Sequence, residues 1–193
     1  MDEIVDFIVT RWAIVIQSVF VASLLTILWV YLPIFWGAPW IPSPLRLVAR
    51  MLELAEVKPG QRVVDLGAGD GRVVVLAAKK YHAVAIGVEI DPLRVLIANL
   101  WILLLGVRGR AKVEWGDLRR FPVAGADAVV LSLLQGTNQT IKENLQKTLH
   151  PGAKVVSHTY SISGWTPSAL DERHGIFVYE IGNTGDEVET KFY

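Results

Sequence analysis

Hydrophobic residues follow two different patterns in the two parts of the chain. Near the start, the run "WAIVIQSVFVASLLTILWVYL" (12–32) lies in a stretch between Arg11 and Arg46 that contains no charged residue. As a helix this run would be about 31 Å long, close to the roughly 30 Å of a bilayer's hydrocarbon core. Aromatic residues, which favour membrane interfaces, cluster near its ends: Trp12, Trp29, Tyr31, Trp36 and Trp40. The pattern predicts one transmembrane helix, with a buried core helix as the alternative.

The charges beside this helix predict its orientation. The leader "MDEIVDFIVTR" is acidic, unlike a secretory signal or a mitochondrial transit peptide. Its only basic side chain is Arg11, whereas Arg46, Arg50 and Lys58 follow the helix. By the positive-inside rule, we expect a single-pass protein of the cell membrane whose C-terminal domain is cytoplasmic.

Prolines then separate the apolar run from the rest of the chain. They occur at positions 33, 39, 42 and 44, where they cannot sustain a helix. The expected organisation is a membrane anchor at 1–35, a proline-rich linker at 36–44 and a domain at 45–193.

Within the domain, helical periods alternate with short β-branched runs. A lead-in helix is expected at 45–57, and three more helices at about 71–80, 91–105 and 138–149. Strands are expected at 62–66, 83–89, 111–115, 127–133, 153–160, 175–181 and 187–193. The last two are joined by "NTGD", a turn sequence that predicts a C-terminal β-hairpin. The pattern predicts an α/β fold with a Rossmann-like, seven-stranded sheet covered on both faces by helices.

Composition narrows the class of protein. Hydrophobic residues make up 52% of the 193 residues and mean hydropathy is +0.38, in agreement with a membrane segment. The formal net charge is zero, so no basic field would attract nucleic acid. The absence of cysteine excludes disulfides, thiolate metal sites and a cysteine nucleophile. No group of His, Asp and Glu has metal-ligand spacing, and no metal is expected.

The stretch "VVDLGAGDGR" (63–72) is the first candidate for chemistry. Its glycines, Gly67, Gly69 and Gly71, have a G-x-G-x-G spacing that differs from the dinucleotide fingerprint, and no G-K-[ST] follows. Asp65 and Asp70 would repel a pyrophosphate but favour a ligand with cationic groups. S-adenosylmethionine, which carries a sulfonium and an α-ammonium, fits this requirement.

Two more acids follow later strands. Glu89 ends the second strand in "GVEIDP", where a carboxylate can accept from both ribose hydroxyls. Asp117 in "WGDL" follows the third strand and could accept from the adenine amino group. Helix N-caps and a turn residue are the alternatives for these acids and for Asp65. Together, and in this order behind the glycine loop, they favour cofactor binding.

Several motifs carry a resemblance to a known family. They are "PSPLRLVARMLELA" (42–55), "VVDLGAGDGRVVVLAA" (63–78), "GVEIDP" (87–92), "NQTIKENLQKTLHPGAKVVSH" (138–158) and "GWTP" (164–167). From about residue 42 onward the chain resembles class I S-adenosylmethionine-dependent methyltransferases. Within them it most resembles the archaeal broad-specificity protein-lysine methyltransferases and the mitochondrial ATP-synthase c-subunit lysine methyltransferase, which also has an N-terminal membrane segment.

The resemblance implies roles for particular residues. Asp65, Gly67, Gly69 and Asp70 would hold the methionine part of the cofactor, Glu89 the ribose and Asp117 the adenine edge. Ser43 matches the threonine of the family's lead-in helix, which implies closure over the cofactor. One position departs from the pattern: the archaeal enzymes carry an acid after "SH", and this chain has Thr159.

The substrate side of the site gives fewer signals, and no catalytic residue is assigned. After the fourth strand the chain reads "LSLLQGTNQ" (131–139), without the Asp/Asn-Pro-Pro-aromatic turn of base-modifying enzymes. His158 is a candidate base or a structural histidine. Lysine methylation needs a neutral, aligned amine, which a dry apolar channel favours. Tyr160 and Trp165 are candidates for its wall, with core packing as the alternative.

The sequence therefore predicts a membrane-anchored protein-lysine N-methyltransferase acting on membrane-proximal lysines, with no nucleic-acid partner. The alternatives are a lipid or quinone methyltransferase at the membrane and a non-catalytic cofactor-binding scaffold.

The helix "DPLRVLIANLWILLLGV" (91–107) has apolar residues on both sides. The inward stripe is expected to be Val95, Ala98, Ile102 and Leu105. The outward stripe, where charges are usual, is Leu93, Leu96, Ile97, Leu100, Leu103 and Leu104. We expect this face to contact the membrane interface, with a protein contact or a covering segment as the alternatives.

Overall fold

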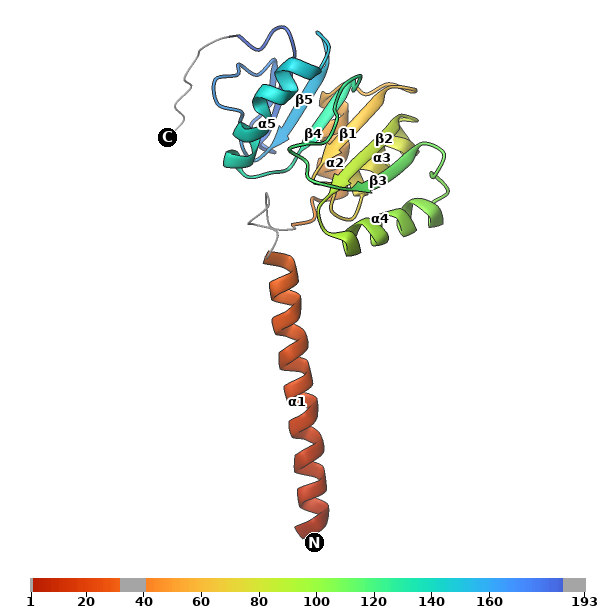
Figure 1. Cartoon of the computed structure of the whole chain (residues 1–193), viewed down its shortest axis with the longest axis vertical. Helices are drawn as coiled ribbons and strands as arrows, with labels where there is room; N and C mark the ends of the chain where they lie inside the picture. The colour runs from red at the N-terminus through yellow and green to blue at the C-terminus, as the bar shows by residue number, and fades with distance from the viewer. Residues whose placement is uncertain (1, 32–40, 186–193) are drawn as a thin grey trace. The chain divides into compact units, whose positions relative to one another are not determined.

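The computed structural model of the chain describes residues 2–31 and 41–185 (Figure 1). The chain divides into two compact units, Met1–Ile41 and Pro42–Tyr193. Trp36, Trp40, most of the predicted linker and the predicted strand 187–193 lie outside the described residues.

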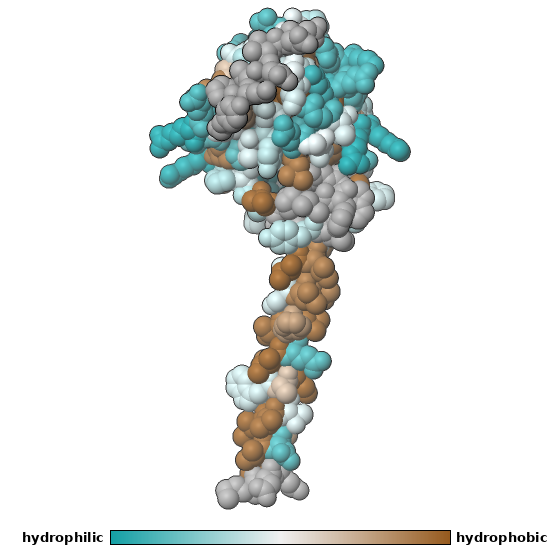
Figure 2. Space-filling model, turned by 90° about the vertical axis from the view of Figure 1, so that its left-hand side faces the viewer, coloured by the Kyte–Doolittle hydropathy of each residue, from teal (hydrophilic) through white to brown (hydrophobic). Residues whose placement is uncertain are grey.

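The first unit contains one long helix, α1 (Asp2–Tyr31). It starts earlier than the predicted 12–32 because the acidic leader contains no glycine or proline and continues the helix. The guanidinium of Arg11 lies 4.7 Å from the ring centroid of Phe7, one turn earlier. Within α1, Ile4–Trp29 is long and apolar enough to span a bilayer, with a mean hydropathy of 2.0 and no buried residue. In Figure 2 the surface of α1 is predominantly hydrophobic along its length.

The second unit is a seven-stranded sheet in the order β3-β2-β1-β4-β5-β7-β6. Its strands are β1 (Arg62–Leu66), β2 (Val84–Glu89), β3 (Ala111–Trp115), β4 (Ala128–Leu131), β5 (Lys154–His158), β6 (Ala169–Asp171) and β7 (Ile176–Glu180). The first five are parallel to one another, and β7 is antiparallel to both β5 and β6. The predicted seven-stranded α/β sheet is confirmed.

The second strand of the predicted C-terminal hairpin, 187–193, lies outside the described residues. Within the described residues, β7 forms a hairpin with β6, which was not predicted as a strand. The reason is that β6 has only three residues and follows "GWTPS", so it shows no alternation of apolar and polar positions.

Helices cover both faces of the sheet. One face packs against α2 (Leu45–Leu54), α3 (Arg72–Lys80) and α4 (Pro92–Leu104) through a core that includes Val48, Val74 and Ile102. The opposite face packs against α5 (Gln135–Thr148) through Ile141 and Leu145. The helices begin and end within a few residues of the predicted positions.

Close packing surrounds the start of the glycine loop. Gly87 lies in the middle of β2, and a Cβ there would come within 2.5 Å of the Cβ of Ala68. Only glycine therefore lets the loop after β1 pack against β2, as the hydrogen bonds from Gly67 and Ala68 N–H to the carbonyl of Val88 require (3.0 and 2.9 Å).

Candidate cofactor and substrate site

The glycine loop turns the chain from β1 into α3 at the carboxyl edge of the sheet. Gly67, Gly69 and Gly71 all have positive φ, of 92°, 54° and 79°, which favours glycine at each position. At Gly71 there is a second reason, since a Cβ would lie 3.0 Å from the Cβ of Ala98 on α4. The loop thus adopts a backbone path that brings N–H groups and the end of β2 together.

Glu89, at the end of β2, binds this loop. Its side chain is buried and accepts hydrogen bonds from the backbone N–H of Gly69 (Oε2, 2.9 Å) and of Asp91 (Oε1, 3.0 Å). A carboxylate has about four acceptor positions, so each oxygen keeps one for a ligand. This geometry fits a pair of ribose hydroxyls, the role that the sequence predicted for Glu89.

Asp65 lies within β1 and is only 4% exposed. Burial, together with the negative charges of Glu89 and Asp70, raises the pKa of its carboxyl to about 8. An acid in this state gains most from a ligand that brings a positive charge. The environment of Asp65 therefore fits the α-ammonium of the methionine part of S-adenosylmethionine.

Asp70 has a partner that was not predicted from the sequence. Arg72 binds both carboxylate oxygens of Asp70, with Nε–Oδ1 at 2.9 Å and Nη2–Oδ2 at 2.5 Å. The same guanidinium donates from Nη1 to the backbone carbonyl of Ser43 at 2.6 Å. Arg72 thus joins the lead-in segment to the glycine loop, and it places Ser43 beside the predicted cofactor site.

A second arginine was also missed. Arg94, near the start of α4, is 2% exposed and lies 3.9 Å from Glu89 Oε1 and 3.6 Å from Asp91 Oδ2. Asp91 is the N-cap of α4 and accepts from the N–H of Leu93 and Arg94. The sequence offered a signal, because Arg94 is the single charged residue in a predominantly apolar helix, and a buried charge needs a partner.

Asp117 follows β3 and is partly exposed. Its Oδ1 accepts from the N–H of Arg119 at 2.9 Å, and its Oδ2 lies 3.9 Å from the guanidinium of the same residue. It is therefore a turn residue in this structure, as the alternative interpretation held. A carboxylate keeps further acceptor positions for an adenine amino group, so both roles are compatible.

The candidates for the substrate side lie at the end of β5. His158 is half-buried, and burial lowers the pKa of its imidazole below the ordinary value. Tyr160 is exposed. Trp165 is buried against Tyr179, with ring centroids 5.5 Å apart, so it packs in the core. Thr159 between His158 and Tyr160 has a φ of 71°, an uncommon backbone conformation for a β-branched residue.

Buried polar groups hold the loop 159–165 above the core. Asn138 on α5 is fully buried and donates to Ser157 Oγ (3.1 Å) and to the carbonyl of Tyr160 (3.2 Å). Ser157 Oγ donates to the same carbonyl at 2.5 Å, and the hydroxyl of Tyr179 accepts from the N–H of Ile162 at 2.9 Å. No role was predicted for Asn138 from the sequence. Its hydrogen bonds fix the backbone beside His158 and Tyr160.

The sheet order, the glycine loop and the buried acids Asp65 and Glu89 define the class of protein, a class I S-adenosylmethionine-dependent methyltransferase. A solved structure from Salinibacter ruber, described as an RNA methyltransferase in complex with S-adenosyl-L-homocysteine, superposes with a TM-score of 0.69. It is 36% identical, and the match covers 79% of this chain and 99% of that one.

The family is shown by its sequence. Residues 65–169 match the ANTKMT methyltransferase domain, and the chain belongs to this family. A protein-lysine N-methyltransferase of Saccharolobus islandicus is 38% identical over 151 residues, which cover 75% of this chain and 94% of the relative. The adenine nucleotide translocase lysine N-methyltransferase of Mus musculus is 27% identical, covering 94% of this chain and 76% of the relative. The predicted family, enzyme class and cofactor are confirmed; the roles of individual site residues stay predictions.

Proposed function

We propose that this chain is a membrane-anchored methyltransferase that transfers methyl groups from S-adenosylmethionine to lysine side chains of membrane-proximal proteins. The observation that carries the proposal is the match to an archaeal protein-lysine N-methyltransferase along nearly its whole length. The glycine loop, Asp65 and Glu89 lie within the stretch that matches the family. A non-catalytic scaffold would have no use for this buried acid cluster.

The geometry supports a mechanism without a strong base. When bound, S-adenosylmethionine would supply an electrophilic methyl group to a neutral lysine amine, with S-adenosylhomocysteine as the product that leaves. The half-buried His158, whose lowered pKa keeps it neutral near pH 7, can accept the proton that the amine loses. Asn138 and Ser157 donate to the carbonyl of Tyr160, so the backbone beside His158 is preorganised for the substrate.

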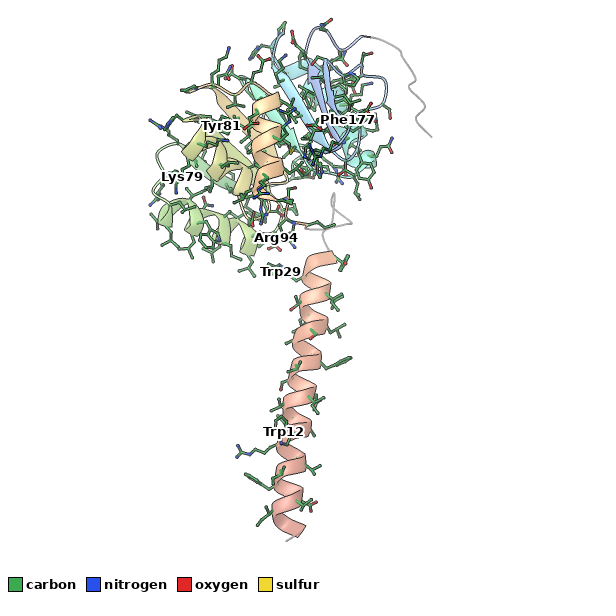
Figure 3. All side chains as sticks on the ribbon, turned by 180° about the vertical axis from the view of Figure 1, so that it is seen from behind. Trp12, Trp29, Lys79, Tyr81, Arg94 and Phe177 are labelled. Carbon is green, nitrogen blue, oxygen red and sulfur yellow. The ribbon has the colours of Figure 1, made fainter. Side chains whose placement is uncertain are left out.

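The anchor and its orientation are part of the proposal. They are supported by the length and hydropathy of Ile4–Trp29 and by the exposed aromatic residues Trp12 and Tyr31 (Figure 3 labels Trp12). An N-terminal signal sequence would have similar length and composition, but the acidic leader argues against one. The excess of arginine and lysine after α1 favours a cytoplasmic domain at the cell membrane.

One experiment tests the substrate class. The full chain is incubated with methyl-labelled S-adenosylmethionine and membranes from cells that lack it, and label is counted in protein, lipid and RNA fractions. We expect label in protein and methyl-lysines after acid hydrolysis, with activity rising above neutral pH as more lysine is uncharged. The chain itself should remain in the membrane pellet after an alkaline wash.

Two other outcomes would contradict the proposed substrate. Label confined to the lipid extract would support the lipid or quinone alternative. Label confined to RNA would extend to this chain the activity named for the Salinibacter protein.

A further inference from the structure

The outer face of α4 is apolar and exposed. Its exposed side chains, with those of the C-cap residue, are Leu93, Leu96, Leu100, Trp101, Leu103, Leu104 and Leu105. Leu96 and Leu104 are 66% and 67% exposed. No charged side chain of α4 lies on this face, because the one charged residue of the helix, Arg94, is buried. In Figure 3 the side chains on the outer side of α4 point away from the sheet. We call the exposed set the leucine face.

Contacts on the inner side fix α4 in this orientation. Asn99 donates to the carbonyl of Val113 on β3 (2.7 Å) and accepts from the N–H of the same residue (3.1 Å). It therefore takes the place of a neighbouring strand on the edge of the sheet. Ala98 packs against Gly71, and Arg94 lies beside Glu89. Turning the helix to bury the leucine face would break these contacts and bury unpaired polar groups.

The predicted stripes were mostly right. Of the inward stripe, Ala98 and Ile102 are buried and Val95 is partly buried. Of the outward stripe, the leucines are exposed and Ile97 is partly exposed. Leu105 was assigned to the inward stripe and is instead 38% exposed, because the helix ends at Leu104 and its direction changes there.

An aromatic residue lies beside the start of α4, and exposed arginines follow α4 and β3 in the chain. Trp115 ends β3, is 71% exposed, and donates from Nε1 to the carbonyl of Ile90, just before α4. Exposed arginines lie in the two neighbouring segments: Arg108 and Arg110 after α4, and Arg119 and Arg120 after β3. Tryptophan favours the headgroup region, and arginines favour anionic headgroups. A leucine face with a tryptophan beside the start of its helix and arginines in the segments that follow α4 and β3 has the chemistry of an interfacial membrane helix.

Ser43, near the start of the domain, is linked to α4 by a short chain of contacts. Ser43 is bound through Arg72 to the glycine loop, whose Gly71 contacts Ala98 of α4. Eleven residues, 32–42, separate Ser43 from α1, and a chain of this length reaches at most about 40 Å. If α1 spans a bilayer, the surface of that bilayer is the first large apolar partner within reach.

We propose that the leucine face of α4 inserts into the interface of a lipid bilayer containing anionic lipid, as a second membrane contact of the catalytic domain. The helix is too short to span the bilayer, at about 20 Å for its length. The N-cap of α4, Asp91, comes two residues after Glu89, so such insertion holds the cofactor edge of the sheet close to the lipid surface. The inference rests on the proposed function, and it narrows the substrates to lysines near the membrane surface.

The test uses the second unit alone, residues 42–193, so that α1 cannot cause membrane binding. This unit has its own core, and the Salinibacter structure matches it along 99% of that protein's length. We expect the fragment to float with vesicles of phosphatidylcholine and phosphatidylglycerol. The triple variant Leu96→Glu, Leu100→Glu, Leu103→Glu should lose at least about tenfold in vesicle affinity, because three charges would have to enter the interface. A control with the same net charge change on α5, Gln146→Glu, Lys147→Gln, Thr148→Glu, should bind like the unaltered fragment.

Tryptophan fluorescence gives a readout of the face that inserts. The fragment keeps three tryptophans: Trp101 and Trp115, which are exposed, and Trp165, which is buried. Lipids brominated on their acyl chains should quench the emission of the first two, and Trp101→Phe with Trp115→Phe should remove the quenching.

Other results would overturn the proposal. Vesicle binding without quenching, or a fragment that is monomeric and unbound, would show that the leucine face does not insert. A stable dimer that the triple variant dissociates would assign the leucine face to a protein contact. Binding of S-adenosylhomocysteine and lysine methylation by the same fragment are measured separately, so failure of the proposed function is distinguishable.

Discussion

Replacing Glu89 by glutamine should weaken the binding of S-adenosylmethionine by about 100-fold while the domain stays folded. In the structure, each carboxylate oxygen of Glu89 accepts one backbone N–H, from Gly69 and from Asp91, and keeps one position for a ribose hydroxyl. Glutamine has a single acceptor oxygen, and its NH₂ group would face a donor. A hydrogen bond to a charged group contributes about 1.5–3 kcal/mol, and about 1.4 kcal/mol corresponds to a factor of ten.

Calorimetric titration with S-adenosylhomocysteine measures this effect, and thermal unfolding checks that the domain is intact. Glu143→Gln is the matched control, because this glutamate is exposed on α5 and pairs with Lys147 on the same helix. It should bind the ligand like the unaltered protein. An unchanged affinity in the Glu89 variant would refute the ribose role, and tighter binding of NAD than of S-adenosylhomocysteine would refute the cofactor assignment at this site.

The sequence predicted those parts of the fold that depend on local patterns. The strands β1 to β5 follow from short β-branched runs, and the position of Glu89 follows from its place at the end of β2. The glycine loop was recognisable because Gly67, Gly69 and Gly71 need positive φ, a property that belongs to each residue itself. The short strand β6 could not be found in this way, because its pairing with β7 depends on a neighbour rather than on its own three residues.

Contacts between distant residues could not be predicted. Arg72 lies 29 positions from Ser43, and Asn99 lies 14 positions from Val113, so no periodicity relates them. Arg72 binds the carbonyl of Ser43 in the lead-in segment, and Asn99 binds the backbone of Val113 on the edge strand β3. These backbone groups need side-chain partners only once the domain has folded. Asn138 is a similar case, since its partners come from the next strand and loop. These three polar residues position the site, and their roles depend on the tertiary structure.

The affinity for S-adenosylmethionine should depend on pH through Asp65. The pKa of this carboxyl is raised to about 8, first by burial and then by Glu89 and Asp70. At pH 7 the free enzyme therefore holds a proton there, and a cationic α-ammonium must displace it. Affinity should rise by up to about tenfold per pH unit between about pH 6 and 8. Above about pH 8 it should fall again, because the α-amino group of the ligand loses its own proton, with an ordinary pKa near 8.

Titration calorimetry near neutral pH in two buffers of different ionisation enthalpy should detect the release of nearly one proton on binding. The variant Asp65→Asn should bind weakly, release no proton and lose the acid limb of the profile. Methylthioadenosine, which lacks the amino-acid part, is the matched control ligand, and its affinity for the unaltered enzyme should not change over the same pH range. A rise in its affinity would show that another group titrates.

Asp65→Asn should weaken ligand binding, but it should raise the stability of the ligand-free enzyme. The folded-state pKa of Asp65, about 8, lies above its ordinary value of 3.8, so the folded state binds the extra proton between these values. The free energy of unfolding therefore falls as pH rises from about 4 to 8, and above about pH 8 a buried carboxylate remains charged. Asp65→Asn removes this cost.

At about pH 8.5, above the folded-state pKa, the Asp65→Asn variant should unfold at a higher temperature than the unaltered protein when no ligand is present. With saturating S-adenosylmethionine the order should reverse, because ligand that binds only the folded state stabilises the unaltered protein more than a variant with weaker affinity. Calorimetric scans of both proteins, with and without ligand, measure the four unfolding temperatures. A variant that is less stable under both conditions would mean that Asp65 supports the fold rather than the ligand.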